Sequence, residues 1–339
     1  MALLEVSDLS VRFDGDDGAV HAVDQVSFTL QPREVLAIVG ESGCGKSVTA
    51  MSLLKLLPPA ATVTGEARFD GRDLLSMDAR AIRSVRKREI SFVFQEPMTS
   101  LNPAYTVGRQ VGEVLRRHMG LKGAAERDRT LELLELVGIP APQRRISEYP
   151  HQLSGGMRQR VVIAMALVMN PALVIADEPT TALDVTIQAQ ILELLGDLTR
   201  RLGTSVLLIT HDLGVVAENC TRVIVMYAGE VVEEAATSEL FAHAHHPYTE
   251  GLLGAMPRVG GEKDRLATIP GTVPPPTNWP KGCRFRDRCP YSWERCEAEH
   301  PPLYQIGGGH TSRCHLAEEP ERRQHPHPPL AAQRGATAA

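Results

Sequence analysis

The chain has 339 residues, enough for two domains at about 100–200 residues each. Its 43% hydrophobic and 23% charged residues are ordinary for a globular protein, and its net charge of −5 gives no support for a nucleic-acid binder. The N-terminus lacks the basic start and apolar core of a signal peptide, and the most apolar segment, Val161 to Ala176, is short and interrupted by Asn170-Pro171. We therefore expect a cytoplasmic protein whose contact with a membrane is peripheral and made through a partner.

Apolar and polar residues alternate along residues 3–39, which predicts an antiparallel sheet. A further short sheet segment is expected over residues 62–76, around the Asp70-Gly71 turn. Phe13 lies in the first stretch, where an aromatic ring either stacks on an adenine or faces the core. The alternation fits both interpretations of Phe13, so both stay open.

A glycine-rich loop of the pattern GxxxxGKS follows this sheet, between the apolar run Val35–Val39 and a helix-compatible stretch, Val48–Leu57. Glycines let the backbone curl so that successive N–H groups face phosphate oxygens, and the helix N-terminus adds partial positive charge. Lys46 supplies a cation for the β- and γ-phosphates, and the Ser47 hydroxyl suits Mg²⁺. A nucleoside triphosphate site is therefore expected at Gly40, Glu41, Ser42, Gly43, Cys44, Gly45, Lys46, Ser47 and Val48.

Polar residues end several apolar strands farther along the chain: Gln95, the pair Asp177 and Glu178, and His211. Because ligands of α/β sheets bind at the carboxyl ends of the strands, these side chains are expected at the nucleotide crevice. One of the two acids can hold Mg²⁺ through water, and the other can deprotonate the attacking water. Gln95 and His211 can contact water, metal or the γ-phosphate, although each alone is more often structural.

The segment after Gln95 is helical and charged in composition, which predicts a helical subdomain over about 96–160. Near its end, Leu153-Ser154-Gly155-Gly156 places a serine and two glycines at a helix N-terminus, a second phosphate site. If the helical subdomain stands away from the core, this site reaches the phosphates of Lys46 across a dimer more easily than within one chain. The sequence therefore predicts nucleotide held between two chains.

Four of the six cysteines lie near the C-terminus, separated by five, six and seventeen residues: Cys283, Cys289, Cys296 and Cys314. In a reducing compartment, structural disulfides are not expected. Charges and prolines surround these cysteines, so burial as small apolar side chains explains them poorly. Zinc sites more often contain cysteine pairs about two to four residues apart, and wider gaps suit a four-cysteine iron–sulfur cluster. A cluster, a zinc site and free structural thiols all stay open.

Together these motifs resemble the ATPase subunits of ABC transporters. The phosphate loop, Gln95, Leu153–Gly156, Leu173–Glu178, Ala182-Leu183-Asp184 and His211 occur in the order of that family, over residues 3–235. The resemblance implies an α/β fold: a P-loop NTPase core of the ABC-ATPase type, with an antiparallel β subdomain and a helical subdomain.

The resemblance also implies roles for individual residues. Mg²⁺ is expected at Ser47, Gln95 and Asp177. Glu178 is expected to act as the catalytic base, His211 as the sensor of the γ-phosphate, and Asp184 in the loop between subunits. Ser154 and Gly156 are expected to donate to nucleotide bound by the partner chain, and Phe13 to stack on adenine.

A narrower resemblance, to the dipeptide/oligopeptide/nickel importer branch, comes from residues 95–103, residues 181–188, His246-Pro247-Tyr248-Thr249 and residues 282–315. It implies an ABC ATPase domain over 1–235 and an irregular cysteine-containing C-terminal domain of the oligopeptide-transporter type over 236–317. The composition of residues 318–339 predicts a disordered tail. Some members of this branch carry an iron–sulfur cluster, which favours a [4Fe–4S] cluster at the four cysteines.

The activity implied by this branch is ATP hydrolysis that powers import of dipeptides or oligopeptides across the cytoplasmic membrane. The implied partners are a second, different ATPase subunit, two transmembrane permease subunits and an extracytoplasmic substrate-binding protein. Residues 97–110 are expected to help form the groove for a permease helix. The alternatives are an importer of nickel or another small solute, and a soluble ABC ATPase of DNA repair or translation, which the single cassette and the negative charge disfavour.

Overall fold

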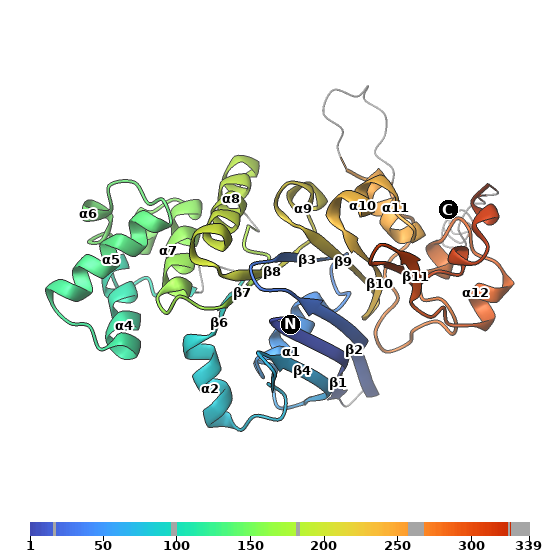
Figure 1. Cartoon of the computed structure of the whole chain (residues 1–339), viewed down its shortest axis with the longest axis horizontal. Coiled ribbons are helices and arrows are strands. Elements are labelled where there is room, and N and C mark those ends of the chain that lie inside the picture. Colours follow the sequence, from blue (N-terminus) through green and yellow to red (C-terminus); the bar gives the residue numbers. More distant parts are fainter. Residues whose placement is uncertain (16–17, 96–99, 181–183, 257–267, 325, 327–339) are drawn as a thin grey trace. The chain divides into compact units, whose positions relative to one another are not determined.

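Figure 1 shows the computed structural model, which describes residues 1–15, 18–95, 100–180, 184–256, 268–324 and 326. The chain divides into two compact units, each assembled from segments distant in sequence. The first contains Met1–Leu3, Leu30–Val35 and Ser76–Ile209, and the second contains Leu4–Thr29, Leu36–Leu75 and Thr210–Ala339. Within the described ranges, no helix is both long and apolar enough to cross a membrane.

A parallel sheet lies at the centre of the first unit. Its strands are β6 (Ile90–Val93), β7 (Leu173–Asp177) and β8 (Ser205–Thr210). β7 pairs in parallel with both neighbours, so that Val174 lies opposite Ser91 on one side and Val206 on the other. Every residue of β7 and β8 is buried, which explains why both strands were recognisable as nearly continuous apolar runs.

The helices of the first unit confirm that the segment after Gln95 is helical. α4, α5 and α7 pack against one another, and α7 also packs on β6 (Figure 1). Val107, Val111 and Leu115 are buried along one face of α4, the spacing of an amphipathic helix. The bounds in this unit are α2 (Ala79–Arg88), α4 (Val107–Met119), α5 (Ala124–Leu136), α6 (Pro142–Arg145), the 3₁₀ turn η1 (Pro150–Gln152), α7 (Gly155–Leu167) and α8 (Val185–Leu202).

The predicted antiparallel sheet is confirmed in the second unit. Its strands, in spatial order, are β2 (Gly18–Leu30), β1 (Leu4–Gly15), β4 (Ala61–Phe69) and β5 (Arg72–Asp73). β1 and β4 run antiparallel, with Leu4 opposite Phe69 and Phe13 opposite Ala61. Asp70 and Gly71 both have positive φ, 48° and 74°, and form the expected turn between β4 and β5.

A second sheet in this unit carries the strand before the phosphate loop. β3 (Val35–Val39) pairs in parallel with β9 (Arg222–Tyr227), which forms a hairpin with β10 (Glu230–Ala236). The helices are α1 (Lys46–Leu53), α9 (Leu213–Asn219), α10 (Thr237–Ala242), α11 (Pro247–Gly254) and α12 (Glu294–Ala298). α1 begins two residues before the predicted start at Val48 and ends at Leu53 rather than Leu57.

The C-terminal region extends this second sheet. β12 (His310–Ser312) pairs antiparallel with β10, and β11 (Tyr304–Gly307) pairs with β12. The sequence did not reveal these strands, because they are short and largely polar. The remaining turns are the 3₁₀ segments η2 (Arg286–Arg288), η3 (His315–Ala317) and η4 (Pro320–Gln324). η4 lies in the segment that the composition assigns to a disordered tail; residues 325 and 327–339 of that segment lie outside the described ranges.

A buried carboxylate on β10 holds the C-terminal region to the sheet. Glu233 is fully buried and accepts hydrogen bonds from the backbone N–H groups of His245 (2.5 Å) and His246 (3.0 Å), and it also contacts the ring of His310 (2.7 Å). Burial opposes ionisation of this carboxyl, but the hydrogen bonds hold the pKa of Glu233 below its usual value. A charged Glu233 therefore connects β10 to the start of α11 and to β12.

Candidate functional site

Close backbone packing shapes the phosphate loop. Gly40, which follows β3, has φ 151°, and a side-chain carbon there would come 2.2 Å from the carbonyl oxygen of Met226 on β9. Gly45, at φ 102°, precedes α1, and a side-chain carbon would come 2.6 Å from the carbonyl oxygen of Ala22. Only glycine fits at both positions, so the two glycines of the motif are required by the fold as well as by any phosphate.

Lys46 is buried and lies across the loop. Its ammonium donates to the carbonyls of Gly40 (2.8 Å) and Glu41 (3.0 Å). α1 begins at this residue without a side-chain N-cap or an acidic residue in its first turn. The first-turn N–H groups and the helix dipole are thus directed to the loop, which is the arrangement that binds phosphate.

Cys44 is fully buried within the loop. Burial raises the pKa of its thiol, although the ammonium of Lys46, 3.8 Å from the sulfur, opposes this effect. Because thiolates are the reactive form of cysteine, Cys44 behaves as a small core residue rather than as a reactive thiol.

The two acids and Gln95 come together in the first unit. Asp177 is buried at the end of β7, and Glu178 follows in a left-handed conformation, φ 43°, with its N–H bonded to the carbonyl of Ile209 on β8 (2.9 Å). The side-chain amide of Gln95 donates to the Glu178 carboxylate over 3.0 Å. A positive φ is costly outside glycine and is found disproportionately at functional sites, so the turn at Glu178 adds to the evidence from the sequence.

The Ser154 and Asp184 side chains both cap helices. The Ser154 hydroxyl accepts from the N–H of Met157 at the start of α7 (3.3 Å), and the Asp184 carboxylate accepts from the N–H of Ile187 at the start of α8 (3.0 Å). Both residues are exposed. Helix capping accounts for these side chains within one chain and leaves the N-terminus of α7 accessible.

Gly156 is buried where α7 meets α8. A side-chain carbon at this position would come 2.4 Å from Cγ2 of Ile187. The absence of a side chain at Gly156 therefore sets how closely the two helices approach.

The remaining predicted nucleotide residues lie in the second unit or outside the described ranges. His211 is exposed directly after β8, and Phe13 is half-buried near the end of β1. Thr181, Ala182 and Leu183, and residues 96–99, lie outside the described ranges, so the structure gives no account of those parts of the two motifs.

The four C-terminal cysteines line one small cavity of about 10 Å³, with aromatic neighbours that include Phe285 and Trp293. Cys289, Cys296 and Cys314 are buried, although charged residues surround them in the sequence; Arg288 and Arg295, each next to one of these cysteines, form ion pairs with Glu41 and Glu299. Burial, with smaller effects from neighbouring cysteines, raises the pKa of Cys283 to about 12 and the pKa values of Cys289 and Cys314 well above normal. Among the described residues, no three histidine, cysteine or acidic side chains are placed to hold a single metal ion.

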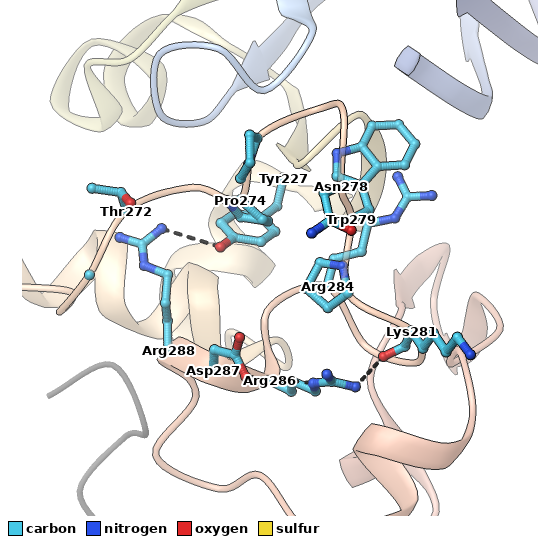
Figure 2. Close-up of a pocket in the computed structure, with 13 residues that line it drawn as sticks. Tyr227, Thr272, Pro274, Asn278, Trp279, Lys281, Arg284, Arg286, Asp287 and Arg288 are labelled. Carbon is cyan, nitrogen blue, oxygen red and sulfur yellow. Dashed lines mark hydrogen bonds and ion pairs between the residues drawn. The ribbon is translucent and has the colours of Figure 1, made fainter. Parts of the chain in front are cut away.

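A larger pocket, of about 620 Å³, is lined mainly by residues 271–288, which overlap the cysteine-containing segment of the chain (Figure 2). Four basic residues contribute to its lining: Lys281, Arg284, Arg286 and Arg288. The Arg284 guanidinium lies 3.6 Å from the ring centre of Trp279 and forms an ion pair with Asp24. No sequence pattern predicts this pocket, because most of its walls come from an irregular, proline-rich segment.

Comparison with known proteins agrees with this arrangement. Residues 23–181 match the ABC transporter family, and residues 232–296 match the C-terminal region of oligopeptide/dipeptide transporters. A probable peptide ABC transporter ATP-binding protein of Sinorhizobium fredii (y4tR) is 52% identical over 94% of this chain and 96% of its own. The oligopeptide transport ATP-binding protein AppD of Bacillus subtilis is 50% identical over 94% of this chain and 97% of its own.

A solved structure supports the fold. The dimeric ATP-binding cassette MJ0796, in a post-hydrolysis state bound to ADP and phosphate, is 30% identical, with a TM-score of 0.62 over 69% of this chain and 98% of the other. The protein is thus an ABC-type P-loop ATPase. More narrowly, the chain belongs to the ATP-binding subunits of the oligopeptide/dipeptide branch of ABC transporters, because the relatives match it over nearly its full length.

The contact between α7 and α8 yields a first prediction. Gly156→Ala is expected to destabilise the chain by about 1–3 kcal/mol, because the new methyl group overlaps Ile187. Adding Ile187→Ala to Gly156→Ala removes the overlap and should recover part of the lost free energy of unfolding. Urea unfolding of the three variants and the double-mutant cycle measures the interaction.

The matched control is Gly196→Ala in α8, where the nearest neighbour of the new carbon is a guanidinium nitrogen of Arg200 at 3.6 Å. This variant is expected to gain up to about 1 kcal/mol from helix propensity. Equal effects at both glycines would contradict the packing role of Gly156.

Proposed function

We propose that this protein hydrolyses ATP to power an importer of dipeptides or oligopeptides across the cytoplasmic membrane, at whose cytoplasmic face it is peripheral. The observation that carries the proposal is the combination, in one chain, of an ABC ATPase and the C-terminal region of oligopeptide/dipeptide transporters. Relatives named for peptide transport cover almost the whole chain, which supports this choice of cargo.

The roles of the site residues follow from their chemistry and from the family. Lys46 binds the β- and γ-phosphates, while the loop supplies backbone N–H groups. Mg²⁺, when bound, neutralises charge between these phosphates. The residues proposed for ATP are Phe13, Gly40, Glu41, Ser42, Gly43, Cys44, Gly45, Lys46, Ser47, Val48, Ser154, Gly155, Gly156 and Asp184, with Ser47, Gln95 and Asp177 around Mg²⁺.

Glu178 is the proposed catalytic base, since its carboxylate can accept a proton from the attacking water. Its contact with Gln95 supports the assignment, because a side-chain amide that donates to the carboxylate holds it in one orientation. His211 is the proposed contact to the γ-phosphate. Ser154, Gly156 and Asp184 act toward the ATP of the partner ATPase.

The partners in this proposal are a second, different ATPase subunit, two transmembrane permease subunits and an extracytoplasmic substrate-binding protein. The relative of known structure is dimeric, which supports pairing of two cassettes. Residues 100–110, with 97–99, are proposed to receive a permease helix.

We also propose that Cys283, Cys289, Cys296 and Cys314 hold a [4Fe–4S] cluster. Four cysteines that line one small cavity, with aromatic side chains beside them, fit the donor set of such a cluster. A single zinc ion fits the spacing of these cysteines less well, because zinc sites more often contain cysteine pairs about two to four residues apart. A cavity of about 10 Å³ has room for roughly one water, so binding of a cluster requires the walls to separate.

The role of Glu178 is tested by Glu178→Gln. This variant is expected to bind ATP normally and to lose hydrolysis by at least about 100-fold, because the amide cannot accept the proton. ATP should then accumulate in a closed dimer, detectable by size-exclusion chromatography. Glu66→Gln, at an exposed position on β4, is the control and should hydrolyse ATP like the wild type. Wild-type turnover by Glu178→Gln would contradict the assignment.

The cluster is tested by anaerobic purification followed by iron, sulfide and zinc analysis and a visible absorption spectrum. About four irons and four sulfides per chain are expected, with loss of both in Cys289→Ser. Cys220→Ser, which removes a buried thiol outside the cavity, should retain them. Stoichiometric zinc, or no metal in the wild type, would contradict the assignment of an iron–sulfur cluster.

The transport role is tested by isolating tagged protein from membranes solubilised with detergent. Two polytopic membrane subunits and a second ATPase should co-purify, and peptide uptake should stop in cells that carry Glu178→Gln. Co-purification with nucleic acid instead would contradict the proposal.

A further inference from the structure

Glu41 is an acidic residue inside the loop that binds the triphosphate. Its N–H donates to the hydroxyl of Tyr248 on α11 over 2.7 Å, and its carbonyl accepts from Lys46 over 3.0 Å. Its carboxylate adds a negative charge to the loop that is proposed to hold the phosphates. An unpaired charge of this kind weakens the binding of ATP by like-charge repulsion.

Arg288 pairs with this carboxylate through both of its terminal nitrogens. The distances are 2.5 Å from Nη1 to Oε2 and 2.9 Å from Nη2 to Oε1, the geometry of a bidentate ion pair. The Arg288 side chain is only 3% exposed, whereas that of Glu41 is 33% exposed. The pair is therefore partly desolvated, where charges interact more strongly than at a surface.

The Arg288 guanidinium is fixed by several other contacts. Nε donates to the carbonyl of Pro270 over 2.8 Å, and Nη1 lies 3.4 Å from the hydroxyl of Tyr227 (Figure 2). Burial opposes the charge, but the hydrogen bonds to Glu41 and Tyr227 raise the pKa of Arg288 above its ordinary value. A permanent cation is thus held in one place.

Arg288 comes from the cysteine-containing region, about 250 residues after Glu41 in the chain. It ends the short turn η2, and the next residue is Cys289, which lines the cysteine cavity. Near the other end of the same turn, Arg284 follows Cys283 and donates to the carbonyl of Ala228 over 2.6 Å. The segment between these two cysteines therefore places one arginine on the β9–β10 turn and another on the phosphate loop.

We propose that Arg288 is a positioning residue for ATP: it neutralises and orients Glu41, so that the C-terminal region sets the affinity of the phosphate loop for nucleotide. The inference rests on the proposed role of this loop in binding ATP. It assigns to the region after the ATPase a function in the hydrolytic site itself, in addition to any cluster that it holds.

The test measures the affinity of the full-length protein for a fluorescent ATP analogue, together with KM and kcat for ATP. Arg288→Met, which keeps the apolar stem, is expected to raise Kd and KM about tenfold while kcat changes less than about twofold. Adding Glu41→Gln to Arg288→Met removes the uncompensated charge and should return Kd to within about threefold of the wild type. Arg288→Lys keeps the charge but not the bidentate geometry, so it should recover part of the affinity.

Arg295→Ala is the matched control. Arg295 lies in α12 of the same region, pairs with Glu299, Glu318 and Glu319, and contacts no residue of the phosphate loop among its described partners. The Kd of Arg295→Ala for the ATP analogue should equal that of the wild type. Where Arg288→Met fails to fold, as judged by its urea midpoint, Arg288→Gln replaces it.

Three results would overturn the inference: wild-type affinity in Arg288→Met, no recovery on adding Glu41→Gln, or an equal loss in Arg295→Ala. A wild-type protein that binds no ATP would instead contradict the proposed function. The two failures are therefore distinguishable in one set of titrations.

Discussion

The close approach of Gly40 to the carbonyl of Met226 is the constraint on which the nucleotide loop depends. It brings the end of β3 against β9, so the loop starts from a strand whose position is set by its neighbour. The β9–β10 turn then returns to the same loop, because the N–H of Gly229 donates to the carbonyl of Cys44 over 3.1 Å. The phosphate loop, β3 and the β9–β10 hairpin thus form one structural element, held by backbone contacts that only glycine permits.

Buried charge organises the chain around this element. Glu230 and Glu233 both lie on β10 and are almost fully buried, yet each has partners: His300, Arg284 and Arg313 around Glu230, and His310 around Glu233. Buried ion pairs contribute little net stability, because desolvation offsets their attraction, but removal of one partner is costly. We infer that these pairs specify how the irregular C-terminal region is arranged on the sheet. A region with so few regular elements has little else to define one conformation.

The sequence predicted the core of this protein well, for physical reasons. β7 and β8 are buried along their whole length and so appear as apolar runs, and the phosphate loop needs glycines at fixed spacing. The C-terminal region was not predictable in the same way. β12 has three residues, and Arg288, next to the buried Cys289, pairs with Glu41, a partner far away in the chain. Local charge misled the prediction there, because the sequence does not show where a charged side chain finds its counter-ion.

The same reasoning explains why Glu41 could not be assigned more than a backbone role from the sequence. An acid in a phosphate loop is unfavourable unless a cation compensates its charge. In the sequence, the basic residue nearest to Glu41 is Lys46. Lys46 does not pair with the Glu41 carboxylate, because its ammonium contacts the backbone carbonyls of Gly40 and Glu41 instead. The compensating cation comes from η2, between two residues of the cysteine cavity. Any displacement of that short turn moves Arg288 relative to the loop, so Arg288 connects the cysteine cavity to the phosphate loop.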